Sequence, residues 1–180
     1  PGLTYPRPER GGERVLKLLP KIDPKWFQTQ AARDRVPDII GWLTFEHDGA
    51  ITAAAMLDAI DKKWPESPAA AKATPKLLET VVTGRPAGQQ IKAAGVLSKI
   101  DPKWATTEKG REAIGKLVEI ATTKYASQRN ESERVLTAID PKWSERPETR
   151  ATASRLIVDL TEESADVRKW AAGMLKKIDP

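Results

Sequence analysis

Apolar positions along this chain recur with the spacing of α-helices. Five isoleucines each have an apolar or small residue three, four and seven positions earlier. Positions with these offsets lie on one face of a helix. The pattern therefore predicts helices of about 12 residues that end at these isoleucines, and we call them the B helices. The isoleucines are Ile22, Ile60, Ile100, Ile139 and Ile178.

A second set of helical segments, the A helices, lies between the B helices and shows the same apolar spacing. Pro37 and Pro75 fall inside two of them, and an internal proline removes one backbone hydrogen bond and kinks a helix. Gly115 and Ser154 take the same place in the other two, so we expect a bend or a close contact there in every unit. No segment alternates apolar and polar residues, so no sheet is predicted. The A segments span residues 36–43, 74–81, 114–121 and 153–160.

The pentapeptide Ile-Asp-Pro-Lys-Trp closes the B helices at a nearly constant interval. Its isoleucines are 38, 40, 39 and 39 residues apart, and a step of about 40 residues is typical of stacked repeats. Asp-Pro fits a helix cap followed by the first helical position, which predicts a short helical turn between each B helix and the next A helix. The motif is intact at 22–26, 100–104 and 139–143, has Lys62 in place of proline at 60–64, and is cut short at 178–180.

The tryptophans of the pentapeptide offer large apolar rings with one N–H donor each. We expect them to form a ladder along one edge, each ring wedged between successive units and its N–H reaching a backbone carbonyl. The alternative is an exposed aromatic stripe that binds an extended peptide or stacked bases. The predicted ladder comprises Trp26, Trp64, Trp104 and Trp143.

An aspartate row and a lysine row accompany the tryptophans. Two rows of opposite charge predict a ladder of surface ion pairs, each worth about 0–1 kcal/mol. The alternative is that the lysines form a track for phosphates. The rows are Asp23, Asp61, Asp101 and Asp140, and Lys25, Lys63, Lys103 and Lys142.

Composition agrees with a thin stack of helices. Hydrophobic residues make up 39% and charged residues 31% of the chain, which suits units that each bury one layer against their neighbours. There are no cysteines, which excludes disulfides, thiolate metal sites and cysteine nucleophiles. The net charge of +5 is only a mild excess of basic residues. A dedicated nucleic-acid binder usually concentrates more positive charge on one face.

The chain divides into a short start and one long body. Residues 1–12, rich in proline and glycine, predict a linker or irregular cap. Residues 13–180 predict a single stack, whose first B helix has no A partner. The chain does not begin with methionine, so we expect a fragment or processed product. No membrane-length apolar run or secretory signal is visible, which favours the cytoplasm without identifying a compartment. The stack comprises a half unit at 13–26 and units at 27–64, 65–104, 105–143 and 144–180.

The last unit resembles the HEAT repeat. Residues 156–160 provide the paired apolar residues of its first helix, and residues 166–178 carry the turn aspartate followed by Val-Arg, Ala-Ala, Leu and Ile. The resemblance covers residues 13–180 and weakens at 130–139, where Ser132 and Glu133 replace the alanines. It implies an all-α, right-handed α-solenoid of antiparallel helix pairs with repeats of about 39 residues. It also implies A helices on the convex side, B helices on the concave side, and a scaffold or binding role.

The residues expected on the concave face predict a partner-binding groove. It collects the positions five and one before each isoleucine, where every charged residue is basic and the others are small. Such a groove would accept an acidic peptide or a nucleic-acid backbone. With nearby residues, the predicted groove comprises Arg14, Lys17, Lys21, Lys92, Lys99, Arg134, Trp170 and Lys177.

Two tryptophans lie outside the ladder. Trp42 replaces an aliphatic residue on an A helix and is expected in the core. Trp170 stands where other units carry charged or polar residues, so we expect it to face solvent. There it would contact a partner or, the interpretation we prefer, form the surface on which a further unit stacks.

No residue pattern specifies a chemistry. His47 is the only histidine and cannot build a three-ligand catalytic zinc site. No phosphate loop or nucleophile elbow occurs. We therefore predict no catalytic residue, metal or cofactor. The expected function is that of a non-catalytic scaffold, part of a larger protein, that binds a protein or peptide on its concave face. End-to-end self-association remains open.

The alternative function is nucleic-acid binding. Alkylpurine DNA glycosylases are HEAT-like proteins that use a basic groove with tryptophans and a catalytic aspartate. Here aspartate and tryptophan recur in every unit, and no single pair stands out in the groove. A HEAT-like chromophore lyase fits less well, because the chain lacks cysteine and its repeat is longer.

Overall fold

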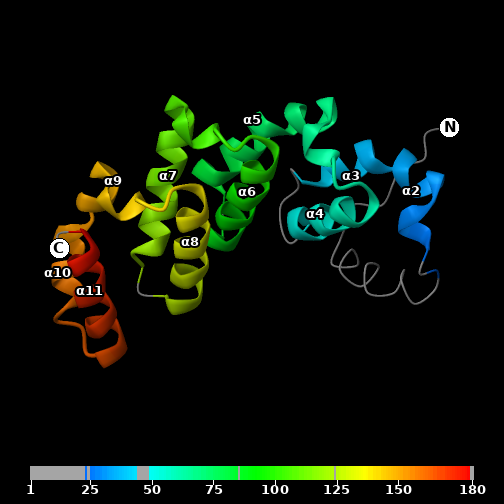
Figure 1. The fold of residues 1–180 in the computed structure, drawn as a ribbon. Coiled ribbons are helices and arrows are strands. Elements are labelled where there is room, and N and C mark those ends of the chain that lie inside the picture. The colour runs from blue at the N-terminus through cyan, green and yellow to red at the C-terminus, as the bar shows by residue number, and fades with distance from the viewer. Residues whose placement is uncertain (1–22, 24, 44–48, 85, 124, 179–180) are drawn as a thin grey trace.

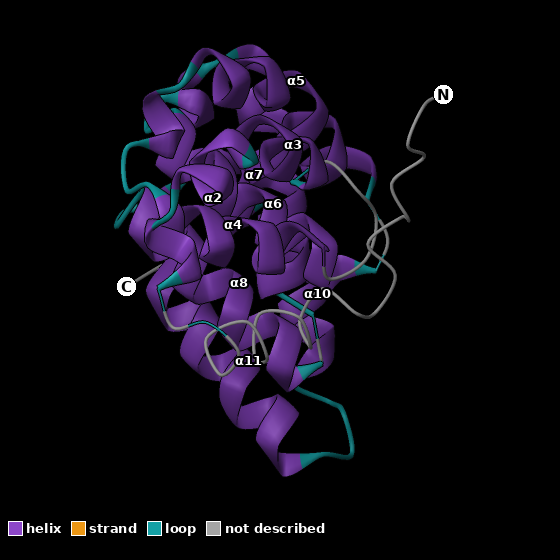
Figure 2. Ribbon diagram, turned by 90° about the vertical axis from the view of Figure 1, so that its right-hand side faces the viewer, coloured by secondary structure: helices purple, strands orange, loops and turns teal. Residues whose placement is uncertain are grey.

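The structure is a computed structural model that describes residues 23–178 except 24, 44–48, 85 and 124, and except the side chains of 49–52. Within these residues the chain forms helices and connecting turns and no strand, which confirms the predicted all-α class (Figure 2). The first predicted B helix and His47 lie outside the described residues.

The predicted A segments and the last four predicted B helices are helical, but each A helix or pair of A helices begins about six residues before the predicted segment. Short 3-10 turns begin at each tryptophan of the pentapeptide. The A helices are α2 (Gln30–Asp34) with α3 (Val36–Trp42), α5 (Pro68–Thr83), α7 (Glu108–Ala121), and α9 (Pro147–Arg150) with α10 (Ala153–Asp159). The B helices are α4 (Gly49–Ile60), α6 (Ala87–Ile100), α8 (Ala126–Ile139) and α11 (Ala165–Ile178). The 3-10 turns are η1 (Trp26–Gln28), η2 (Trp64–Glu66), η3 (Trp104–Thr106) and η4 (Trp143–Glu145).

Each A helix packs against the B helix that follows it. The pairs are α3 with α4, α5 with α6, α7 with α8, and α10 with α11. Neighbouring pairs also touch, A helix to A helix from α3 to α9 and B helix to B helix from α4 to α8. Figure 1 shows the pairs following one another in chain order along the molecule. Their buried apolar side chains form one continuous cluster from Ala32 to Ile178.

The expected interruption of the A helices occurs only in the first and last. The chain turns at Arg35, so Pro37 starts the separate helix α3, as its missing N–H allows. By contrast α5 runs unbroken through the exposed Pro75. Helix α7 runs unbroken through Gly115, where an added Cβ would meet no atom within 4 Å. The predicted close contact at Gly115 is therefore wrong.

The aspartate of the pentapeptide builds the turn rather than an ion pair with the lysine row, although Asp140 also pairs with Arg146. In each described copy its Oδ1 accepts the backbone N–H of the lysine two residues on, at 2.9–3.0 Å. Its carbonyl accepts the tryptophan N–H at 3.0–3.1 Å. The predicted short helical turn is thus confirmed. The predicted Asp–Lys ladder is wrong, because the described aspartates bond the backbone of their own turns. The copy with Lys62 keeps the same bond, so the proline is not required.

Three of the repeated indole rings are buried. Trp64, Trp104 and Trp143 are 0–3% exposed. Each donates its Nε1–H to a side chain six residues earlier, near the end of the preceding B helix. The bonds are Trp64 to Asp58 at 2.8 Å, Trp104 to Ser98 at 3.1 Å, and Trp143 to Thr137 at 3.1 Å. The acceptors are therefore side chains and not the expected carbonyls.

Trp26 differs from the other repeated tryptophans. It is half-buried and meets Phe27 edge-on, with ring centroids 5.2 Å apart. The residue six positions earlier is Pro20, whose side chain offers no acceptor. Turns η1, η2 and η4 also contact the B helix of the pair that follows. Because Trp64 and Trp143 bond side chains of the preceding B helices, η2 and η4 each touch two successive pairs.

The start of each A helix packs closely on the tryptophan carbonyl. Thr29, Ser67 and Thr107 cap their helices by accepting the N–H three residues on, at 3.0–3.2 Å. The residue six after each tryptophan is small and buried, and at Gly110 an added Cβ would lie 1.9 Å from the Trp104 carbonyl oxygen. These residues are Ala32, Ala70, Gly110 and Thr149. The sequence pattern had not singled out this position.

Two alanine substitutions in α7 should have opposite effects. Gly110→Ala should lower the free energy of unfolding by about 1–3 kcal/mol, because its methyl group meets backbone that must shift. Gly115→Ala, in open space on the same helix, should raise it by about 0.5–1 kcal/mol through helix propensity. Urea unfolding measures both. A Gly110→Ala protein as stable as the parent would contradict the close contact.

Removal of one repeated indole should weaken the structure locally. Trp104→Ala should cost about 3–5 kcal/mol, because it empties a buried site and leaves the Ser98 hydroxyl without its donor. Since each pair touches only its neighbours, amide hydrogen exchange should accelerate most in α5–α8 and less in α10 and α11. An equal loss of protection along all described helices would count against this prediction.

Candidate functional site

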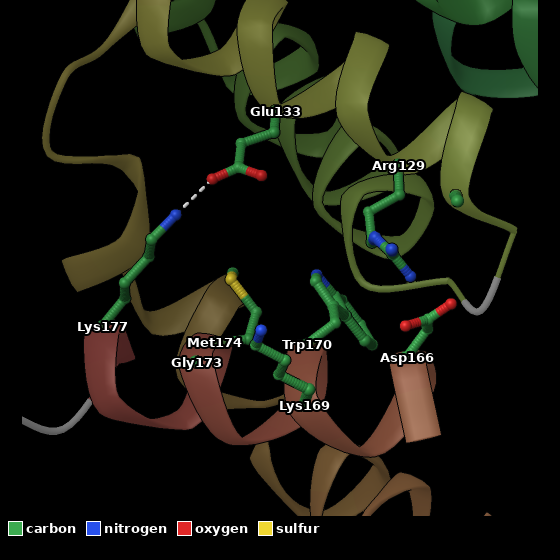
Figure 3. A pocket seen from close by; sticks show the side chains of 9 residues that line it. Arg129, Glu133, Asp166, Lys169, Trp170, Gly173, Met174 and Lys177 are labelled. Carbon is green, nitrogen blue, oxygen red and sulfur yellow. Dashed lines mark hydrogen bonds and ion pairs between the residues drawn. The ribbon is translucent and has the colours of Figure 1, made fainter. Parts of the chain in front are cut away.

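A groove runs between the last two B helices, α8 and α11 (Figure 3). It has a volume of about 490 Å³, and its lining includes Arg129 and Glu133 from α8 and Trp170, Met174 and Lys177 from α11. A second hollow of about 580 Å³ follows the same helix past Glu133 to Arg134 and Ala138. The second hollow is lined by α8 residues alone. We therefore keep the name α8–α11 groove for the first hollow.

Helical spacing explains why these side chains meet. On α8, Ala126, Arg129 and Glu133 are three and four residues apart, and on α11 the same spacing joins Trp170, Gly173 and Lys177. The two rows therefore lie on facing sides of neighbouring helices. Glycine at 173 carries no side chain, which leaves the space between them open.

A guanidinium lies on an indole in this groove. The Arg129 guanidinium carbon is 4.4 Å from the centroid of the Trp170 ring, a cation–π contact. Arg129 is only 8% exposed, and both its Nε and the Nε1 of Trp170 are buried without a hydrogen-bond partner. Burial lowers the pKa of Arg129, an effect that the carboxylates of Glu133 and Asp166 oppose. An arginine remains a cation at neutral pH.

The predicted basic face also contains acids. Lys99 of α6 pairs with Asp58 of α4 at 2.5 Å, and Lys177 of α11 pairs with Glu133 of α8. The expectation of uniformly positive charge is therefore wrong. The acids stand two residues before Ile60 and six before Ile139, so these positions lie on the same face as the positions five and one before an isoleucine. Each lysine of these pairs bridges from one B helix to the preceding one.

The other predicted groove residues are dispersed. Arg134 is exposed and lines the second hollow, while Lys92 is half-buried on α6. Arg14, Lys17 and Lys21 lie outside the described residues. The structure thus brings Trp170 and Lys177 to the α8–α11 groove and places Arg134 in the second hollow. It adds others that the sequence pattern missed, namely Arg129, Glu133, Asp166 and Lys169. Arg129 stands four residues before Glu133 and so lies on the same face of α8, a relation that the sequence spacing contains.

Trp170 does not face solvent as expected. It is half-buried and packs back onto Arg129 of the preceding B helix. The surface exposed at this end lies on α10, where Ile157 and Val158 are 57% and 64% exposed. Ile40 and Val118, which stand at the position of Ile157 in the first and third A segments, are 2% and 1% exposed. Trp42 is half-buried against the apolar cluster, as expected of a core residue.

Two aspartates near the repeated turns are held ionised. Burial raises the pKa of Asp58, but hydrogen bonds from Lys99 and Trp64 outweigh it, and the pKa falls below its ordinary value. The Arg146 Nε–H, 2.6 Å from Oδ2, lowers the pKa of Asp140, against partial burial and with help from the Lys142 N–H.

The described residues bring no three His, Cys, Asp or Glu side chains together in a way that would hold a metal ion. No helix in the described part of the chain is long and apolar enough to span a bilayer. Comparison with known proteins finds no matching family model, no matching curated protein and no matching solved structure.

The Asp140–Arg146 pair predicts a pH-dependent contribution to stability. Asp140→Asn should lower the free energy of unfolding at pH 7 by about 1 kcal/mol, because it weakens a charged hydrogen bond that is partly exposed. The folded protein lowers the pKa of Asp140, so this contribution is complete above the unfolded pKa of about 3.9 and disappears as pH falls through the lower folded value.

The check is urea unfolding of both proteins between pH 7 and pH 2. Arg146→Gln and the double variant complete a mutant cycle that isolates the pair. A difference between parent and Asp140→Asn that stays constant down to pH 2 would exclude this origin.

Proposed function

We propose that this chain is a non-catalytic, HEAT-like α-solenoid module that binds a protein or peptide partner on its B-helix face. The observation that carries the proposal is the α8–α11 groove, where charged side chains and one tryptophan line a hollow on that face. Further support comes from the recurring turn, because α5, α7 and α9 each begin four residues after a buried tryptophan.

Pair-on-pair contact supports the solenoid part of the proposal. Each helix pair touches the preceding and following pair, and the buried cluster is continuous. A right-handed stack with repeats of about 39 residues would place the B helices on the inner, concave side. Extended concave surfaces of this kind serve as binding surfaces in repeat proteins.

The charges of the B-helix face favour a peptide over a nucleic acid. Asp58 and Glu133 pair with Lys99 and Lys177, so two of the predicted basic residues are already neutralised. A phosphate backbone needs an excess of unpaired basic side chains. A protein segment with mixed polar and apolar residues suits a groove that combines Trp170 and Met174 with charges of both signs.

A displayed library of random peptides, selected against the purified chain, tests this proposal. Enriched peptides should bind the parent and lose about tenfold or more in affinity, about 1.4 kcal/mol, when Arg134 and Lys177 are both changed to Glu. The matched control changes Lys72 and Lys109, exposed on A helices α5 and α7, and should leave the affinity unchanged. Circular dichroism establishes that each variant is folded.

Two results would overturn the proposal. One is enrichment of peptides whose binding depends on Lys72 and Lys109 rather than on the groove. The other is binding of duplex DNA with an affinity that falls steeply between two salt concentrations, which would support the nucleic-acid alternative instead.

A further inference from the structure

We infer that Arg129, held on the ring of Trp170, forms a subsite for the carboxylate of an Asp or Glu side chain in an extended peptide lying along the α8–α11 groove. The inference rests on the proposed function and names the chemistry of the partner. It concerns residues that the groove contains but that the repeat pattern does not require.

The first step is the unsatisfied Nε–H of the Arg129 guanidinium. Arg129 is 8% exposed, and its Nε has no hydrogen-bond partner. A buried charged donor without an acceptor costs free energy that an apolar side chain of similar size would avoid. The indole ring attracts the cation but offers no oxygen to its N–H groups.

The second step is the contrast with the same position in other B helices. Counting ten residues back from the closing isoleucine gives Gln90 on α6 and Arg168 on α11. Both turn back to their own units: Gln90 bonds the Val81 carbonyl at 2.7 Å, and Arg168 bonds the Glu162 and Glu163 carbonyls at 2.7 and 2.6 Å. Neither side chain lines the α8–α11 groove.

On α7, two other residues bond backbone carbonyls near the end of the helix, as Gln90 does on α5. Arg155 of the next unit bonds the carbonyl and hydroxyl of Thr122, just after α7. Ser132 donates to the Leu117 carbonyl at 2.7 Å. Polar groups near the end of α7 are thus satisfied without Arg129, whose guanidinium lies between α8 and α11 beside Trp170 (Figure 3).

Charge then selects the ligand. The groove lining holds Arg129, Lys169 and Lys177 against Glu133 and Asp166, which leaves one positive charge in excess. Glu133 is paired with Lys177, while Asp166 acts on Arg129 through its charge. One added carboxylate would neutralise the groove, and a guanidinium binds a carboxylate through two parallel N–H bonds.

Shape favours a peptide over a small free acid. The groove beside Trp170 shares the lining residue Glu133 with the second hollow, which other α8 residues line as far as Ala138. An extended segment would place one acidic side chain at Arg129 while its backbone follows the groove toward Arg134.

The experiment uses two fluorescein-labelled probes, a peptide of alternating Glu and Ala and its counterpart with Gln in place of Glu. Fluorescence anisotropy with the full chain should show at least tenfold tighter binding of the Glu peptide. Arg129→Lys keeps the charge but loses the paired N–H geometry, and it should weaken binding of the Glu peptide about tenfold. Arg129→Met should abolish the preference for Glu over Gln. Arg168→Lys, at the same helical position in α11, is the matched control and should bind as the parent does.

A second readout separates binding from structural support. In the ¹⁵N spectrum of the parent, the Nε–H signal of Arg129 should shift on addition of the Glu peptide and not of the Gln peptide. Equal binding of the two peptides, or unchanged Glu-peptide binding by folded Arg129→Met, overturns the inference. If the peptides selected from the library are uncharged and still depend on the groove, the carboxylate subsite fails while the proposed function stands.

Discussion

The burial of an indole ring at the turns of Trp64, Trp104 and Trp143 is the interaction on which the rest of the structure depends. The ring of Trp104 closes over the end of α6 through its bond to Ser98, and its carbonyl receives the Thr107 hydroxyl at the start of α7. The aspartate three residues earlier fixes the turn by accepting a backbone N–H. One residue therefore joins the end of a helix to the start of the next, which sets the direction of each new pair relative to the last.

A constant turn permits a variable surface. The indole acceptor is Asp58, Ser98 or Thr137, three side chains that share only an oxygen at the right distance. Of these, only Asp58 also binds a lysine from the next B helix. Differences between units therefore concentrate on the B-helix face, where they do not disturb the turn. The α8–α11 groove lies on this face, and its features are specific to the last two units.

Much of the fold followed from the sequence alone. The helices, the turn at Asp-x-Lys-Trp and the absence of a predicted sheet all rest on residues within a few positions of one another. The candidate site followed only in part. Trp170 and Lys177 were identified by their place before Ile178, but Arg129 was missed because its counterparts in other units, Gln90 and Arg168, serve the backbone of their own units.

The sequence by itself determined which segments are helical and that the B helices end at the repeated isoleucines, because apolar spacing and turns act over a few residues. Only the tertiary structure decided that Gly110 touches the Trp104 carbonyl, that Trp170 lies on Arg129, and that Lys99 and Lys177 are paired. The two lysine pairs join residues 41 and 44 positions apart. Their geometry depends on how one B helix is rotated and placed against the next, which no local pattern of apolar and polar residues specifies.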